Sequence, residues 1–481
     1  MKAAKFLLAL MTSTAAVAAL AAPQLSQVTA EVMPRSGAVK ITYSLSEDAV
    51  VTLDDVLVGG VSIGPSNVTK VVGACHRKIK AGTGREIYWF PKKERADLEV
   101  SGTITARLSA YDPATPPEYM LFELRPYQSA NNWTYSTEFT CTNMAYSTRL
   151  YASAANLPDG GLKNIRDYYT RYLVMRKIPA KNVTWRMGYR KLSPNNEHGG
   201  TSQKTNAAPH YVKLTSDYYM GIYPVTFGQE IAVLDNLATL PRTDYFSLAE
   251  SLTGEKWDDL KWGLPYGGVN AGILVNNSRT TNNRQIDNLR GGSAYYWPTG
   301  GHDVKTGTVI ELYRRVMKLP VDLPTEAQWE FAARGGTAGQ TYYGKSYNYT
   351  WGLNTDNLDA NIWWWGNSTL ENGTRYPHPV GMKTANALDL YDMMGNVSES
   401  CLDQYAKSLG SAAATNPKGP TTGSENPKRV YRSGCCCSEE HYARYVHRSA
   451  FREGVSQDDS HFWGIRRFGF RVWAPAKAIA R

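Results

Sequence analysis

The sequence predicts two parts, an N-terminal all-β sandwich and a larger α+β domain with little regular secondary structure. Three observations lead to this prediction. The 481 residues are enough for two or three domains. Hydrophobic residues make up 42% of the chain and charged residues 20%, so a sizeable core can form. Short β-like runs separated by turns fill residues 24–125, whereas aromatic residues, glycines and brief helical signals prevail from about residue 171.

Residues 1–21 have the pattern of a signal peptide. Two lysines precede an apolar stretch, and Ala19-Leu20-Ala21 forms a small-residue cleavage site. Thr12, Ser13 and Thr14 interrupt the apolar stretch, which is therefore too short for a membrane-spanning helix of about 20 residues. No later segment is long and apolar enough to span a bilayer. We therefore expect an exported protein, periplasmic or extracellular, that is cleaved near Ala21 and has no transmembrane anchor.

The charge pattern bears on the choice of partners. The chain has 53 Lys and Arg against 43 Asp and Glu, a net charge of +10 that is dispersed along the sequence. A nucleic-acid partner is not expected, because its footprint would be a clustered basic surface. The excess indicates only a weak attraction to acidic surfaces.

Residues 24–125 are predicted to form an immunoglobulin-like sandwich. Five β-branched or aromatic runs are separated by turn clusters such as Gly59-Gly60 and Asp112-Pro113. The runs are Val39–Leu45, Val50–Leu57, Glu86–Phe90, Thr103–Tyr111 and Tyr119–Leu124. Short strands at this spacing are typical of a small sandwich. Such a domain is most simply a spacer or docking module without chemistry of its own.

Residues 126–170 are irregular and are predicted to be a linker, and residues 171–481 to form the second domain. Two helix starts stand out in it, each with a threonine three residues before a glutamine. They are Thr226 with Gln229 and Thr325 with Gln328, and Gly335-Gly336 would end the second helix after Arg334. This spacing predicts capping boxes, in which the two side chains satisfy opposite unpaired backbone groups of the first turn.

The second domain carries a series of motifs that resemble the formylglycine-generating enzyme, or sulfatase-modifying factor, family. They occur in the order of that family and cover about residues 171–473. They are Leu173–Pro179 with Met187-Gly188, Tyr218–Thr226, Leu323–Gly336, Leu390–Val397, Arg429–Gly434 and Phe468–Val472. The resemblance implies a fold related to C-type lectins, with a small twisted sheet, two helices and long loops. It also implies that Arg448, Arg452 and Arg471 are internal hydrogen-bond anchors.

The enzymes of this family oxidise a sulfatase cysteine to formylglycine with oxygen and with copper held by two cysteines. The resemblance places the first of those cysteines on Ser438 and the second on about Ala443 or Arg444. Neither position has sulfur, so the usual thiol pair is not retained.

Cys435 and Cys437 are the candidate catalytic replacement. Residues two apart in a strand share a face, and soft sulfur ligands suit copper(I). The other cysteines are Cys75, Cys141, Cys401 and Cys436, and the sequence does not choose among their pairings. The alternative for this run is small buried side chains and a disulfide, with Cys401 as a candidate partner.

Two segments resemble the calcium sites of the family. Asn396 and Glu399 match one site, and Asn361 with the carbonyl of Ile362 matches part of the other. Carboxylate, amide and carbonyl oxygens are the hard ligands that calcium prefers. The alternative is a turn at each place in which the side chains bond backbone amides.

A ligand-binding face is the other candidate site. Trp364, in the run Trp363-Trp364-Trp365, could stack on a sugar or peptide ring, and His441 lies in the loop that follows the cysteines. The alternative for the tryptophans is core and loop packing.

The sequence is consistent with two functions. The first is a formylglycine-generating or related cysteine oxidase that acts on exported sulfatases, with structural calcium and, if catalytic, copper. The second is a non-catalytic, C-type-lectin-like protein that binds a peptide, a glycan or another exported protein. No Walker loop, Gly-x-Ser-x-Gly elbow or His-Glu-x-x-His motif is present, so nucleotide binding and hydrolase triads have no support.

Overall fold

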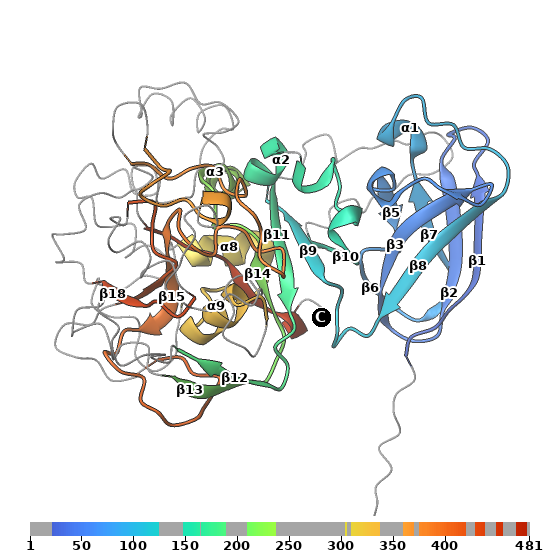
Figure 1. The fold of residues 1–481 in the computed structure, drawn as a ribbon. Coiled ribbons are helices and arrows are strands. Elements are labelled where there is room, and N and C mark those ends of the chain that lie inside the picture. Colours follow the sequence, from blue (N-terminus) through green and yellow to red (C-terminus); the bar gives the residue numbers. More distant parts are fainter. Residues whose placement is uncertain are drawn as a thin grey trace, which may run out of the picture.

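The computed structural model of the chain contains several β-sheets and few helices (Figure 1). The residues described below are 22–124, 148–163, 165–188, 209–236, 304, 309–336, 359–369, 375–419, 429–437, 449–455 and 468–478. The predicted signal peptide lies outside them. Within these residues, no helix has both the length and the apolar character needed to cross a bilayer.

The N-terminal part is built from two β-sheets. The first has the strand order β1-β2-β7-β5, and in the second β3 lies between β4 and β6 and also pairs with β8. The strands of the first sheet are β1 (Leu25–Val32), β2 (Val39–Leu45), β7 (Gly82–Trp89) and β5 (Val71–Gly73). Those of the second are β4 (Val61–Ser62), β3 (Ala49–Val58), β6 (Arg77–Ile79) and β8 (Ile104–Tyr111). A short 3-10 turn, η1 (Pro65–Asn67), and the single-turn helix α1 (Pro91–Glu94) connect strands.

One apolar core joins the two sheets, as expected for a sandwich. Ile41 and Trp89 from the first sheet and Leu53 from the second are almost completely buried in it. In β2, Val39, Ile41 and Tyr43 are buried while the residues between them are half-exposed. This alternation is the period of a strand with one face on the core, and it explains why the sequence predicted β2 correctly.

The predicted boundary at residue 125 does not coincide with the boundary between the sheets. The run Tyr119–Leu124 forms β9 (Tyr119–Glu123), which pairs with β11 (Tyr172–Ile178) in the central sheet of the second part. Met120 and Phe122 lie in one core and Tyr119 and Leu121 in another, so β9 is buried on both faces. A continuous apolar run of this kind is typical of an interior strand, not of a sandwich strand with one exposed face.

The central sheet has five strands in the order β10-β9-β11-β14-β20. Besides β9 and β11 it contains β10 (Thr148–Tyr151), β14 (Tyr218–Gly221) and β20 (Trp473–Pro475). The segment predicted as a linker therefore contributes a strand, and it also holds η3 (Ala154–Asn156), η4 (Gly161–Lys163) and α2 (Ile165–Thr170). The first strand of the second part, β9, and the last strand of the described chain, β20, thus belong to one sheet.

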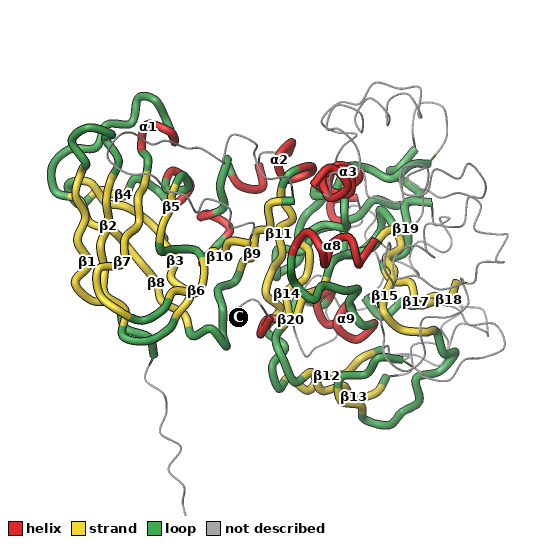
Figure 2. Tube along the Cα trace, turned by 180° about the vertical axis from the view of Figure 1, so that it is seen from behind, coloured by secondary structure: helices red, strands yellow, loops and turns green. Residues whose placement is uncertain are grey.

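Among the described residues, two smaller sheets and three longer helices lie on the side of the central sheet away from the sandwich, with loops between them (Figure 2). The sheets are β12 (Val183–Met187), β13 (His210–Leu214) and β16 (Ala414–Thr415), and β18 (Glu453–Val455), β17 (Arg429–Arg432), β15 (Ser398–Gln404) and β19 (Phe468–Gly469). The helices are α3 (Phe227–Asn236), α8 (Val309–Met317) and α9 (Glu326–Ala333), and η6 (Ala476–Ala478) follows β20.

Both predicted capping boxes are confirmed. The backbone N–H of Gln229 donates to Oγ1 of Thr226 at 3.1 Å, and the N–H of Thr226 donates to Oε1 of Gln229 at 3.1 Å. Thr325 and Gln328 make the same reciprocal pair at the start of α9. Gly335 and Gly336 then end α9 with φ near +70°, a backbone angle that residues with a Cβ rarely adopt.

The two parts of the chain are joined by contacts of β10 and the segment after it with the sandwich. The backbone N–H of Leu150 donates to the carbonyl of His76, and Nδ1 of His76 lies 2.8 Å from the carbonyl of Leu150. The side-chain amide of Asn156 donates to the carbonyl of Asp54 at 2.8 Å. These bonds hold the sandwich against the edge of the central sheet.

Candidate functional site

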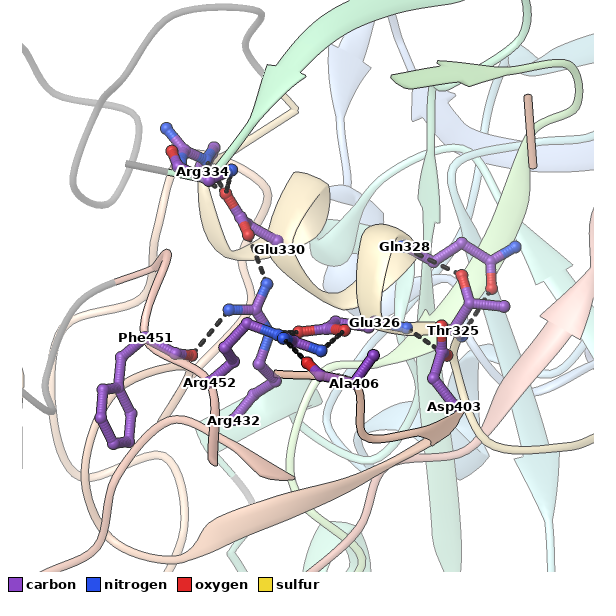
Figure 3. A network of polar contacts seen from close by, with 11 residues as sticks. Thr325, Glu326, Gln328, Glu330, Arg334, Asp403, Ala406, Arg432, Phe451 and Arg452 are labelled. Carbon is purple, nitrogen blue, oxygen red and sulfur yellow. Dashed lines mark hydrogen bonds and ion pairs between the residues drawn. The ribbon is translucent and has the colours of Figure 1, made fainter. Parts of the chain in front are cut away.

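Two carboxylates on α9 organise the interior of the second part. Glu326 and Glu330 lie four residues apart, which places them on one side of the helix, and each is about 1% exposed. Glu330 accepts from Nε of Arg334 at 2.9 Å and from a terminal nitrogen of Arg432 (Figure 3). Glu326 accepts two hydrogen bonds from Arg452, at 2.5 and 2.9 Å. The helix thus fixes three guanidinium groups from three chain segments.

The protonation of these acids follows from their neighbours. Burial acts to raise the pKa of Glu330, but Arg334 and Arg432 outweigh it and lower that pKa below its usual value. Asp403 accepts from the backbone N–H of Glu326, and burial together with the Glu326 charge raises the pKa of Asp403. The network therefore contains both ionised pairs and a carboxyl group that retains its proton at a higher pH than usual.

A second buried pair joins Glu399 of β15 to Arg471. Both side chains are fully buried, and Nε of Arg471 lies 2.8 and 2.9 Å from the two carboxylate oxygens. The indole N–H of Trp329 donates to the same carboxylate at 2.7 Å. Arg471 also donates to the carbonyls of Gly221 and Ile222. The expectation that Arg452 and Arg471 are internal anchors is confirmed by these contacts, and Arg448 lies outside the described residues.

The cysteine run follows the anchored strand β17. Arg432, the last residue of β17, also donates to the carbonyl of Phe451 at 2.6 Å. Ser433 and Gly434 then take positive φ values of 87° and 70°, and the chain turns at Cys435–Cys437. These three cysteines form a buried cluster of their own, and we call this segment the cysteine turn.

The cysteine turn differs from the strand expected for Cys435 and Cys437. The sulfur atoms of Cys436 and Cys437 lie 3.5 Å apart, and Sγ of Cys437 lies 3.7 Å from the carbonyl of Arg375. The backbone N–H of Cys436 donates to the carbonyl of Asn396 at 2.9 Å. Thiolate sulfur is a soft donor, which is the type of ligand that copper(I) prefers. Cys401 is buried with a free thiol, so the disulfide considered for it is not formed. Burial raises the pKa of this thiol well above its usual value.

Three of the residues predicted to bind calcium, Asn396, Glu399 and Ile362, already make hydrogen bonds or an ion pair with other groups of the protein. Oδ1 of Asn396 accepts from the backbone N–H of His378, and its amide donates to the carbonyl of His378, both at 2.9 Å. Glu399 is paired with Arg471 as described, and the carbonyl of Ile362 accepts from Asn367 at 3.0 Å. Within the described part of the chain, no three His, Cys, Asp or Glu side chains are grouped to hold a metal ion. A calcium ion at Asn396 and Glu399 would have to displace these donors; that site, and the one at Asn361, stay predictions.

The tryptophan run lies beside the cysteine turn. Trp364 is only 7% exposed, packs in a core cluster and donates its indole N–H to Asp359 at 2.7 Å, which favours the packing alternative. Its neighbours Trp363 and Trp365 are partly exposed. The backbone N–H of Asn396 donates to the carbonyl of Trp363 at 2.9 Å, which ties the run to the cysteine turn. His441 lies outside the described residues, so its ligand-binding role stays a prediction.

Two cations rest on the partly exposed indoles, a feature that the sequence analysis did not find. The guanidinium carbon of Arg375 lies 3.1 Å from the ring centre of Trp365, and Nζ of Lys383 lies 3.8 Å from that of Trp363. The ring of His378 stacks on Trp363 with centroids 3.7 Å apart and an interplanar angle of 15°. Burial, followed by the charge of Lys383, lowers the pKa of His378 to about 4. We call Trp363, Trp365, Arg375, His378 and Lys383 the aromatic–cationic cluster.

The fold and the buried network define a mostly β, loop-rich domain held by arginine–carboxylate pairs. Residues 182–473 match the family model described as "Sulfatase-modifying factor enzyme 1-like domain". Because the match covers more than half of the 481 residues, the chain belongs to this family, as its motifs indicated.

Relatives with this domain have different names. A "Chaperone protein LppX" of Paenibacillus barcinonensis is 33% identical over 23% of this chain and 37% of its own length. A "Formylglycine-generating enzyme" of Streptomyces coelicolor is 35% identical over 29% and 43%, respectively. A "Serine/threonine-protein kinase pkn1" of Chlamydia pneumoniae is 34% identical over 28% and 19%. The chain thus spans less than half the length of these relatives.

Among solved structures, a chain titled "Structure of PvdO from Pseudomonas aeruginosa" aligns with a TM-score of 0.36 and 18% identity. The alignment covers 63% of this chain and 94% of that one.

Proposed function

We propose that the protein is an exported, non-catalytic member of the sulfatase-modifying factor family whose loop-built face binds a ligand. The observation that carries this proposal is the loss of sulfur at both positions of the thiol pair, Ser438 and Ala443 or Arg444. Copper-dependent oxidation in the family needs two thiolates to hold the metal. The remaining cysteines of this region are buried and adjacent, with Cys436 and Cys437 in contact, an arrangement unlike two thiols separated by four residues.

The retained scaffold supports a binding role. Glu326, Glu330 and Glu399 fix the arginines that hold the loops, so the domain keeps a defined surface without the catalytic pair. The exposed part of that surface near the cysteine turn is aromatic and cationic, which is typical of recognition sites. As part of the same proposal, the second domain is C-type-lectin-like and the protein is exported.

The second candidate function is formylglycine generation by a shifted cysteine pair. The contact of 3.5 Å between the sulfur atoms of Cys436 and Cys437 is the observation that favours it. In that case copper would supply the redox chemistry, sulfatases would be the substrates, and the cysteine turn would hold the metal.

One experiment separates the two candidates. A peptide containing Cys-x-Pro-x-Arg is incubated with the purified protein, copper and oxygen, and the mass of the peptide is measured. The non-catalytic proposal predicts an unchanged peptide, beside an active family enzyme as the positive control. Conversion of the cysteine to an aldehyde, lost in the Cys436→Ser and Cys437→Ser variants but kept in Cys75→Ser, would establish the second candidate.

A further inference from the structure

The cysteine turn brings two neighbouring thiols into contact, which a strand does not do. Adjacent residues of a strand point to opposite faces, so their sulfur atoms would lie apart. Cys436 and Cys437 instead lie in a turn, and their sulfur atoms are 3.5 Å apart. At this distance one thiol donates to the other, so the structure holds the dithiol form of the pair. An S–S bond of about 2.05 Å needs only a further approach of about 1.5 Å.

Hydrogen bonds to a neighbouring turn hold the backbone of the cysteine turn. The N–H of Cys436 donates to the carbonyl of Asn396 at 2.9 Å. The N–H of Gly395 donates to the carbonyl of Ser433 at 3.1 Å, and the hydroxyl of Ser433 donates to the carbonyl of Gly395 at 3.0 Å. Because the backbone is fixed in this way, the two sulfur atoms stay within reach of each other, and a reaction between them is favoured by proximity.

The ring that this pair would close favours a reversible bond over a permanent one. The Cα atoms of adjacent residues are about 3.8 Å apart, below the range of roughly 4.4–6.8 Å that is usual for disulfides. A disulfide closed over a single peptide bond is therefore strained, and strained disulfides are the ones that thiols reduce readily. A permanent structural bridge, which must resist reduction, does not fit this pair.

We propose that Cys436 and Cys437 are a redox-active pair that forms a reversible vicinal disulfide with a small-molecule disulfide, such as glutathione disulfide, as the oxidant. Cys437 reacts first, since it is 8% exposed whereas Cys436 is completely buried. Its thiolate attacks the external disulfide, releases one thiol and becomes a mixed disulfide. The thiolate of Cys436 then attacks Sγ of Cys437 and releases the second thiol. Two protein thiols are oxidised, the external disulfide is reduced to two thiols, and the two protons pass to them.

Oxidation also changes a contact of the neighbouring segment. In the dithiol form the thiol of Cys437 donates to the carbonyl of Arg375 at 3.7 Å. Neither sulfur of a disulfide carries a hydrogen, so this carbonyl loses that donor on oxidation. Arg375 lies over the ring of Trp365, and the N–H of the next residue, Tyr376, donates to the carbonyl of Ser368 at 3.0 Å. The redox state therefore acts on the aromatic–cationic cluster, and this last step rests on the binding role proposed above.

The first test is a mass measurement on the purified protein after incubation with glutathione disulfide, without copper. The remaining thiols are alkylated in urea, and trypsin then releases residues 433–444. We expect the wild-type peptide to carry one alkyl group and one internal disulfide, and to carry three alkyl groups after reduced glutathione is added. Cys435→Ser should keep the disulfide. Cys436→Ser should instead retain glutathione on Cys437, and Cys437→Ser should form no internal disulfide.

The second test follows amide hydrogen exchange, by mass, in the peptides that contain Tyr376. Loss of one weak hydrogen bond at Arg375 should make exchange about two- to fivefold faster in the oxidised than in the reduced wild type. Cys437→Ser is the matched control, because its hydroxyl keeps a donor for the Arg375 carbonyl and cannot form a disulfide. Glutathione disulfide should leave the exchange of this variant unchanged.

Three results would overturn the inference: three alkyl groups in the oxidised wild type, an internal disulfide that persists in Cys437→Ser, or a disulfide that resists reduced glutathione. Equal exchange in the two redox states would remove the effect on Arg375. The wild-type measurements need no variant, so they decide even if a serine variant fails to fold. Both tests contain neither copper nor a sulfatase peptide. Conversion of the Cys-x-Pro-x-Arg peptide would thus end the non-catalytic proposal and leave the redox pair standing.

Discussion

The buried side chains of the N-terminal sandwich are mostly apolar, whereas the described residues of the second part include four buried arginines, Arg334, Arg432, Arg452 and Arg471. Sandwich strands satisfy their backbone groups through ladders such as β2 with β7. In the loop-rich part, many of the described residues lie outside strands and helices, and buried carbonyls there need other donors. Arg471 bonds Gly221 and Ile222, and Arg452 bonds Ala406. Paired arginines therefore replace sheet hydrogen bonds where the backbone is irregular.

The strongest test of this comparison is Arg471→Met. The substitution leaves the buried Glu399 carboxylate without its cation and removes the donors to two carbonyls. We expect a loss of about 3–5 kcal/mol in the free energy of unfolding, measured by urea titration. The control is Arg107→Met in the sandwich, an exposed partner of Asp55, with a cost below about 1 kcal/mol. Equal costs in the two variants would remove the distinction between the two parts.

The pH dependence of stability tests a buried acid that pairs with no arginine among the residues that the structure describes. Glu230 of α3 is fully buried, and burial raises its pKa from 4.5 to about 8, with Tyr313 acting in the opposite direction. A raised folded-state pKa stabilises the protein below pH 4.5, and this contribution is lost as the pH rises toward 8. The wild type should therefore lose up to about 1.4 kcal/mol per pH unit in this window from Glu230.

The matched variant is Glu230→Gln, which is neutral at every pH and has nearly the same shape. Its unfolding free energy, measured by urea titration between pH 5 and pH 8, should fall less steeply than that of the wild type. Parallel curves would mean that Glu230 does not retain its proton in the folded state.

A smaller effect is expected where a cap satisfies the helix backbone. Thr325→Ala removes the acceptor for the N–H of Gln328 at the start of α9. The expected cost is about 1 kcal/mol, visible as a lower urea midpoint with an unchanged slope. Thr369→Ala, at an exposed threonine, is the control and should be neutral. A neutral Thr325→Ala would show that Glu326 and Glu330 hold α9 without its cap.

The smallest effect is expected at an exposed ion pair. Arg315 of α8 lies 3.5 Å from Glu311, one helical turn earlier, and its side chain is 47% exposed. Arg315→Gln should cost no more than about 0.5 kcal/mol and less still in high salt. If Arg315→Gln lowered the free energy of unfolding as much as Arg471→Met does, burial would not be the reason for the large contribution of the paired arginines to stability.

Much of the fold follows from local patterns. The alternation in β2 and the capping boxes at Thr226 and Thr325 involve neighbours in sequence, and the structure agrees with them. The helix α8 was missed, although Val309, Leu312, Tyr313 and Val316 have the spacing of a buried helical face. For the site, the family motifs indicated the anchoring arginines but not the cations on Trp363 and Trp365.

The sequence by itself determined the family, the sandwich and the capped helices, because each depends on residue types at short, fixed spacings. Only the tertiary structure decided that β9 belongs to the central sheet, since its partners in β10 and β11 are chosen by burial on both faces. It also decided which carboxylate each arginine meets, as with Glu399 and Arg471, 72 residues apart. Contacts at such separations depend on how all the loops pack together, and no local pattern encodes them.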